Sequence, residues 1–266
     1  MPREAVIIIP ARHASSRYPG KPLVGLRGAG GHERPLILRS WDAACAVPDI
    51  SGVWVATDDR RIADVARAGG AQVVMTSATC VNGTERCADA LARLGIAPDV
   101  VVNLQGDAPL TPPWFVSALI DAVGNDTPVA TPVLRCTPAI HRQLVEDRAA
   151  GRPGATTAVF DRFGRALYFS KNVLPYAPEP VTAMTEAPVF HHVGVYAYTP
   201  QALAEYVAAP PSTPEQMEGL EQLRFLHLGL SVRCIVVDAK GHAFWELNNP
   251  ADKPRIEAIL RAQGID

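Results

Sequence analysis

The sequence has few cysteines and no pattern among them. The five cysteines are odd in number and include no Cys-x-x-Cys pair, so neither a disulfide framework nor a structural zinc site is indicated. We expect them to be buried free thiols. No apolar run approaches the roughly 18 residues that a membrane helix needs, and no signal-peptide pattern opens the chain. We therefore predict a cytoplasmic protein with no membrane partner.

The sequence also has no large excess of positive or negative charge. The 266 residues carry a formal net charge of −2, which argues against a nucleic-acid partner. The hydrophobic content of 48% is enough to bury one large core. We predict a single domain over residues 1–266.

Two common phosphate-binding motifs are absent. A Walker motif needs a glycine five residues before Gly20, where the chain has Ser15. The only glycine cluster, at residues 28–31, opens no helix after a strand and lacks the last glycine of the dinucleotide motif. This absence disfavours a dinucleotide-dependent oxidoreductase, an alternative that cofactor-binding fluorescence would test.

The most informative stretch is residues 6–23, VIIIPARHASSRYPGKPL. Its four leading apolar residues predict a buried strand, which we expect Pro10 to end because proline has no backbone N–H for a ladder. The following loop carries Arg12, Arg17 and Lys21 among small and turn-forming residues. Cations and free amides after a parallel strand favour an anion-binding loop. A solvated basic loop is the alternative.

Apolar spacing along the chain alternates between strand and helix patterns. This alternation predicts an α/β fold with a doubly wound, mostly parallel sheet. The predicted strands are residues 6–9, 53–56, 72–75, 100–102, 129–134, 157–160, 165–168, 190–198 and 232–237. The predicted helices are residues 35–46, 61–68, 87–94, 114–123, 141–149, 201–207, 217–228 and 250–261. Residues 151–188 are rich in Pro and Gly, and we expect hairpins there that cover one end of the sheet.

Polar side chains follow two of the predicted strands, at the sheet edge where parallel sheets bind ligands. Thr57 and Asp58 follow strand 53–56. Asp107 comes after a glycine beyond strand 100–102, where an acid can hold a divalent cation against phosphate oxygens. A turn aspartate bonded to its own backbone is the alternative.

Two further places have a functional and a purely structural interpretation. Thr84 can cap helix 87–94, and Glu85 and Arg86 then lie in a first turn that is either solvated or part of a site. Strand 190–198 places His192 and Tyr196 on one face, as ligand-binding residues or as satisfied core residues.

Eight short motifs occur in the same order as in one known family. They are residues 10–12 PAR, 17–23 RYPGKPL, 56–58 ATD, 83–86 GTER, 105–107 QGD, 168–170 YFS, 192–196 HVGVY and 220–224 LEQLR. On these motifs the chain resembles the 3-deoxy-manno-octulosonate (Kdo) cytidylyltransferases nearly from end to end. The resemblance implies a nucleotidyltransferase (Rossmann-like) fold, a CTP-dependent enzyme of the EC 2.7.7 type, and a homodimer. The acceptor and dimer subregion would be about residues 151–215.

The resemblance also implies a site, carried over by position. The triphosphate of CTP would be held by Arg12, Ser16, Arg17 and Lys21. The cytosine and ribose would lie among Thr57, Asp58, Gly83, Thr84 and Arg86, with Gln105 nearby. Mg²⁺ would be bound by Asp107, with Asn248 as an uncharged second ligand. The acceptor side maps to Lys171, His192, Tyr196, Glu221 and Gln222. The catalytic groups would be Arg12, Lys21 and Asp107.

The chain departs from the family pattern on the acceptor side. Asn248 stands where the family has a second metal-binding Asp, Lys171 where it has Arg, and Ala108 where an acid is usual. Like charges at ~4 Å cost on the order of 1 to 4 kcal/mol, so losing two carboxylates favours a more negative acceptor. We predict a small acidic acceptor, namely a phosphonate such as phosphonoformate, as in antibiotic biosynthesis. Kdo or a related sugar acid is the alternative, and a catalytically silent CTP-binding regulator is another.

Overall fold

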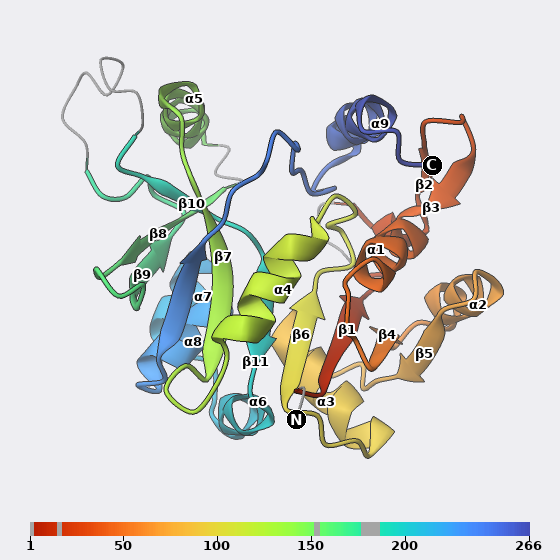
Figure 1. Ribbon diagram of the computed structural model, residues 1–266, viewed down its shortest axis with the longest axis horizontal. Helices are drawn as coiled ribbons and strands as arrows, with labels where there is room; N and C mark the ends of the chain where they lie inside the picture. The colour runs from red at the N-terminus through yellow and green to blue at the C-terminus, as the bar shows by residue number, and fades with distance from the viewer. Residues whose placement is uncertain (1–2, 15–17, 152–154, 177–186) are drawn as a thin grey trace.

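The protein is described here by a computed structural model that covers residues 3–14, 18–151, 155–176 and 187–266. Ser16 and Arg17, two of the predicted triphosphate ligands, lie outside the described residues. A central sheet runs through the molecule, with helices packed on both of its faces (Figure 1).

Ten strands of the described residues form one sheet in the order β5-β4-β1-β6-β11-β7-β10-β8-β9, with β12 paired to β7. They are β1 (Ala5–Ala11), β4 (Gly52–Thr57), β5 (Gln72–Met75), β6 (Val100–Leu104), β7 (Val129–Arg135), β8 (Thr156–Phe160), β9 (Ala166–Ser170), β10 (Phe190–His192), β11 (Val195–Tyr198) and β12 (Val232–Val236). The strands from β5 to β6 pair in parallel, whereas the pairs from β6–β11 to β8–β9 are antiparallel. The α/β class is confirmed. The sheet is mixed, and the predicted parallel pairing holds for the first strands and for the pair of β12 with β7.

The longer helices are α1 (Leu36–Cys45), α2 (Arg60–Ala68), α3 (Gly83–Leu94), α4 (Pro113–Ala122), α5 (Pro138–Ala149), α6 (Pro200–Ala208) and α9 (Lys253–Ala262). Shorter elements are η1 (Lys21–Leu23), α7 (Thr213–Glu218), α8 (Gln222–His227), η3 (Pro250–Asp252) and the hairpin of β2 (Gly25–Arg27) and β3 (Glu33–Pro35). None of the helices in the described part of the chain is both long and apolar enough to cross a membrane.

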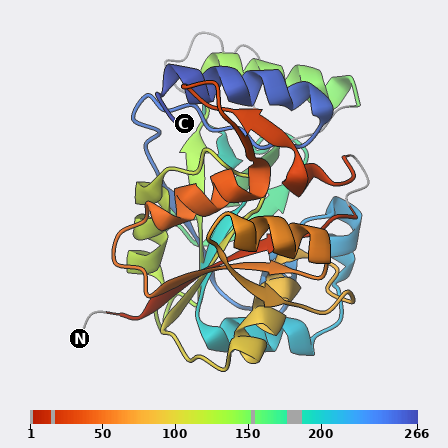
Figure 2. The ribbon, with the colours of Figure 1, turned by 90° about the vertical axis from the view of Figure 1, so that its right-hand side faces the viewer.

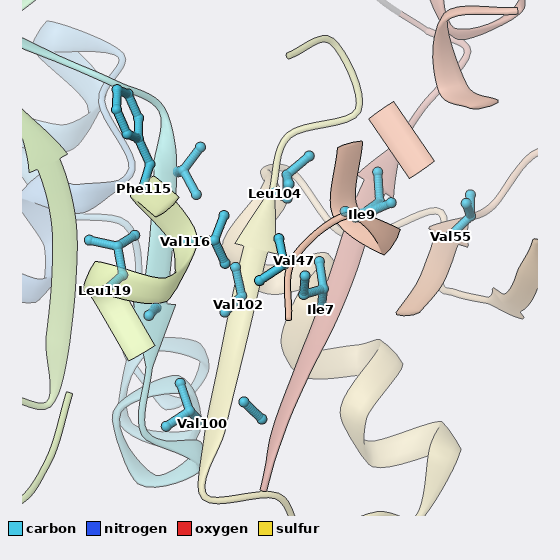
Figure 3. Close-up of a cluster of buried hydrophobic side chains, with 14 of the residues drawn as sticks. Ile7, Ile9, Val47, Val55, Val100, Val102, Leu104, Phe115, Val116 and Leu119 are labelled. Atoms are coloured by element: carbon cyan, nitrogen blue, oxygen red, sulfur yellow. The ribbon is translucent and has the colours of Figure 1, made fainter. Parts of the chain in front are cut away.

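Alternate residues of β1 face two separate cores. Ile7 and Ile9 pack with side chains of α1, α2 and α4 on one face of the sheet, and Val6 and Ile8 pack with α3, α6 and α8 on the other. Figure 3 shows the first of these cores, where Val116 of α4 lies beside Val102 of β6. In the view of Figure 2 the sheet is seen nearly edge-on, with helices on both sides of it. The sequence of β1 is therefore continuously apolar because both faces of the strand are buried.

Pro10 does not end the first strand, contrary to the sequence prediction. β1 runs on to Ala11 and pairs with β4 as far as Thr57. On its other side, pairing with β6 stops at Ile8 opposite Asn103. The missing N–H of Pro10 therefore falls beyond the ladder on that side, where it removes no hydrogen bond between these strands.

Two predicted elements are each divided in the structure. The strand predicted over 190–198 is β10 followed by β11, because the chain exchanges its neighbour β8 for β6 between them. The helix predicted over 217–228 is α7 followed by α8, because Gly219 ends α7 in the left-handed conformation with φ of 63°. Asn82, not Thr84, caps α3.

Candidate active site

A cleft of about 1190 Å³ opens where β1 and β6 end. Its wall includes residues from the end of β1, from the start of α3, from the turn after β6 and from the segment before η3. The predicted site residues that line it are Arg12, Lys21, Gly83, Arg86, Gln105, Asp107, Lys171, His192, Tyr196, Glu221, Gln222 and Asn248. Thr57, Asp58 and Thr84 are not part of its lining.

Lys21 and Asp107 form an ion pair in this cleft, with side chains 15% and 21% exposed. The Lys21 Nζ also donates to the Leu247 carbonyl at 3.2 Å, and the Leu247 N–H donates to the Asp107 carbonyl at 3.0 Å. Three segments far apart in the sequence thus meet at one ammonium group. The Asp107 carboxylate accepts from Lys21, so the interpretation as a self-bonded turn aspartate is wrong.

Gly106 sets the position of Asp107. A Cβ at Gly106 would lie 2.8 Å from the Pro10 carbonyl oxygen, closer than side-chain carbons approach backbone atoms. The turn after β6 therefore needs glycine to pass against the end of β1. The Ser40 hydroxyl also donates to the Gly106 carbonyl at 3.0 Å, which fixes the turn from the side of α1.

Glu246 is a site residue that the sequence reasoning missed. It lines the same cleft, and the Asn248 side-chain amide donates to its Oε2 at 3.4 Å. Burial, and then the nearby Asp107, raises the pKa of Glu246 to about 7. The sequence did contain a signal for it. Glu246 lies two residues before Asn248, and side chains at i and i+2 lie on the same side of an extended chain.

The start of α3 is built by buried polar contacts. The Asn82 side chain accepts from the Glu85 N–H at 2.8 Å. Arg86 is 3% exposed and pairs with Asp58 at 3.1 Å, so its interpretation as part of a solvated turn is wrong. Arg12 reaches the same region, because its Nη1 donates to the Val81 carbonyl at 3.3 Å.

The predicted acceptor residues Tyr196 and Gln222 contact each other. The Tyr196 hydroxyl donates to the Gln222 Oε1 at 3.0 Å. Gln222 is 1% exposed, and its Nε2 is a buried donor with no hydrogen-bond partner within the described ranges. An unmade buried hydrogen bond costs about 1 to 3 kcal/mol. This donor on the cleft wall therefore suits an oxygen of a bound acceptor.

Glu221 connects the first turn of α3 to the turn after β6. Its Oε2 accepts from the Thr84 N–H at 2.9 Å, and its Oε1 accepts from the Gln105 Nε2 at 3.3 Å. Burial raises the pKa of this carboxyl, and the bonds from Thr84 oppose that rise.

His192 and Lys171 are held by protein partners. The His192 Nε2 lies 2.8 Å from the Thr131 hydroxyl, and burial lowers the pKa of His192 to about 3. The ring is therefore neutral near pH 7. The Lys171 N–H donates to Glu218 at 3.0 Å, and its ammonium lies against Gly219. The roles of both residues toward an acceptor remain predictions.

The cleft has oxygen ligands suited to one hard cation. In the described part of the chain, no group of three or more His, Cys, Asp or Glu side chains is arranged so that it could hold a metal ion. Mg²⁺ is commonly held by only one or two carboxylates together with substrate phosphates and water. Asp107 and Glu246, with the Asn248 carbonyl oxygen, match that donor set.

Comparison with known proteins shows the family of this chain. Residues 6–232 match the family model described as Cytidylyltransferase. The 3-deoxy-manno-octulosonate cytidylyltransferase of Maricaulis maris is 41% identical over 259 residues, covering 97% of each chain. The chain belongs to the Kdo cytidylyltransferase family. This confirms the family prediction and the enzyme class, a nucleotidyltransferase.

Further comparisons cover the chain equally well. The mitochondrial 3-deoxy-manno-octulosonate cytidylyltransferase of Arabidopsis thaliana is 37% identical to this cytidylyltransferase, over 97% of this chain and 83% of the plant protein. A solved structure of CMP:2-keto-3-deoxy-manno-octonic acid synthetase complexed with CTP has a TM-score of 0.81 at 33% identity. It covers 98% of this chain and 99% of that one. The names of these relatives refer to Kdo, not to a phosphonate.

Proposed function

We propose that this cytidylyltransferase transfers CMP from CTP to Kdo or a closely related sugar acid and releases pyrophosphate. The observation that carries the proposal is Glu246 beside Asp107 in the cleft. The phosphonate prediction depended on the loss of two carboxylates. Glu246 supplies one carboxylate again, so the charge argument for a more negative acceptor loses half of its basis. The full-length relatives named for Kdo support the same acceptor.

The donor side of the proposal assigns the phosphates of CTP to the cations at the end of β1. Arg12 and Lys21 would neutralise the pyrophosphate as it leaves, and Ser16 and Arg17 remain predicted partners. The first turn of α3, from Gly83 to Arg86, would hold the nucleoside. The related structure complexed with CTP supports a nucleotide in this fold.

Mg²⁺ is the proposed cofactor, held by Asp107 and Glu246 with help from the Asn248 carbonyl oxygen. When bound, the cation would polarise phosphate oxygens and offset their charge. Lys21 neutralises Asp107 in the structure. The ammonium therefore holds the Asp107 carboxylate in place on the cleft wall.

The proposed chemistry is an in-line displacement. An acceptor hydroxyl oxygen bonds to the α-phosphorus while the bond from that phosphorus to the oxygen bridging the β-phosphate breaks, and the hydroxyl proton is lost to solvent. The contribution of the protein is positioning and charge stabilisation. Gln222 would orient the acceptor through its unpaired Nε2, with Tyr196 fixing the Gln222 amide.

The test is a mass-spectrometric screen for CMP adducts from CTP and Mg²⁺ with Kdo, neuraminate or phosphonoformate, alongside pyrophosphate release. We expect the adduct with Kdo. An adduct with phosphonoformate alone would overturn the proposed acceptor. Silence with every acceptor, together with retained CTP binding, would favour the regulator. The matched control is Asp107→Asn, which should bind CTP but release no pyrophosphate.

A homodimer through the subregion 151–215 also stays a proposal. Phe163 and Leu167 of the β8–β9 hairpin are 54% and 62% exposed, and solvent-exposed apolar side chains on an edge strand favour a partner surface. Light scattering that gives a monomer mass at assay concentration would refute it.

A further inference from the structure

Arg224 is a buried cation that the site described so far does not use. It closes the 220–224 motif that supplies Glu221 and Gln222. At 1% exposed it is the largest fully buried side chain of the described residues. A buried guanidinium of this kind is stable only with charged or hydrogen-bonding partners.

The charged partners come from α3 and α7, and the end of α6 supplies the ring of Tyr206 and backbone carbonyls. The Arg224 Nε and Nη2 donate to both carboxylate oxygens of Glu215 at 2.7 Å each. The Nη2 also donates to the Glu85 Oε1 at 3.1 Å. The guanidinium lies 4.0 Å from the centroid of the Tyr206 ring. One side chain of α8 thus holds α7 in a two-bond fork and reaches the first turn of α3.

Two neighbouring hydrogen bonds join the same pieces. The Thr84 N–H donates to the Glu221 Oε2 at 2.9 Å, and the Asn82 side-chain amide donates to the Glu215 Oε1 at 3.4 Å. The first turn of α3, which carries the proposed nucleotide residues, is therefore attached to the segment that carries the proposed acceptor residues. A displacement of this turn must move Glu221.

We propose that Arg224 is a positioning residue that couples the two halves of the site, because it bonds to Glu85 on the nucleotide side and shares α8 with Gln222 on the acceptor side. The inference rests on the proposed function. A nucleotide that fixes the first turn of α3 also fixes Glu221 and Gln222. The acceptor then binds to residues that are already in place, so its binding costs less conformational entropy. Bound CTP then increases the affinity for the acceptor, and the acceptor increases the affinity for CTP by the same factor.

The test uses Glu85→Gln. The amide keeps the size of the side chain and an oxygen that can accept from the Val81 N–H, as Glu85 does at 3.0 Å, but it removes the charge that faces Arg224. Arg224→Lys is the second variant, because lysine keeps the charge and loses the fork. The control is Glu205→Gln on the exposed face of α6.

The measurement is the Kd of a non-hydrolysable CTP analogue by calorimetry, without and with saturating Kdo. For the wild type and Glu205→Gln we expect Kdo to lower this Kd about 5- to 150-fold, the usual range for coupled sites. In both test variants the ratio should fall toward one, while the Kd measured without Kdo changes less. Circular dichroism confirms that each variant is folded.

Two results separate this inference from the proposed function. Product formation by the wild type from CTP and Kdo is recorded first, and its absence overturns the proposed function. Product formation combined with a wild-type ratio in Glu85→Gln and Arg224→Lys overturns the coupling alone. A ratio of one in the wild type also overturns it.

Discussion

The ion pair of Lys21 and Asp107 should contribute to stability as well as to turnover. Exposed ion pairs contribute about 0 to 1 kcal/mol, but these two side chains are only 15% and 21% exposed. Contacting residues in one charged network show coupling energies of about 0.5 to 3 kcal/mol. We expect about 1.5 to 3 kcal/mol here, because Lys21 is also fixed by the Leu247 carbonyl.

The assay is a double-mutant cycle on the free energy of unfolding in urea, with the wild type, Lys21→Met, Asp107→Asn and the double variant. The control cycle uses Arg61 and Asp59, whose side chains are 62% and 17% exposed and should couple more weakly than Lys21 and Asp107. Lys21→Met should also lower kcat/KM by about 10²- to 10³-fold, since one lost charge-assisted donor at a reacting centre costs about 2.7 to 4 kcal/mol.

Additive effects at Lys21 and Asp107, within about 0.5 kcal/mol, would refute the reasoning on stability. Full activity of Lys21→Met would refute the assignment of its ammonium to the leaving pyrophosphate. If the coupling energy of Arg61 and Asp59 is as large as that of Lys21 and Asp107, burial is not the cause of the strong coupling between Lys21 and Asp107.

Three further outcomes follow from single positions. Gly106→Ala places a Cβ 2.8 Å from the Pro10 carbonyl and should lower the free energy of unfolding by about 1 to 3 kcal/mol, so an unchanged urea midpoint contradicts the close approach. The pKa of His192 is about 3 instead of 6.5; the unfolded chain then binds more protons, so stability should fall as pH drops from about 6.5 toward 3. Equal pH slopes for His192→Gln and the wild type would exclude that cause. Glu246→Gln should raise the Mg²⁺ Kd, measured with CTP present, by about 10- to 100-fold, and an unchanged value removes it from the metal site.

Counting charges by position gave the wrong emphasis on the acceptor. Asn248 occupies the place of a family aspartate, so the sequence pattern indicated a lost carboxylate. In the fold, Glu246 lines the same cleft two residues earlier and accepts from the Asn248 amide. Comparing the chain with the family one position at a time does not detect a carboxylate that a neighbouring residue supplies. Only the path of the backbone shows which side chains enter the cleft.

Features that depend on local pattern could be predicted from the sequence. Apolar runs and helical spacing indicated the α/β class, and the positions of Lys21 and Asp107 in segments that follow predicted strands indicated that both face one site. The tertiary structure alone decided where Pro10 lies relative to the ladder of β6 and which way the first turn of α3 faces. Glu85 meets Arg224 across 139 residues of sequence, and no local pattern contains that contact. Burial and pairing of such side chains depend on the packing of distant segments, which local periodicity does not encode.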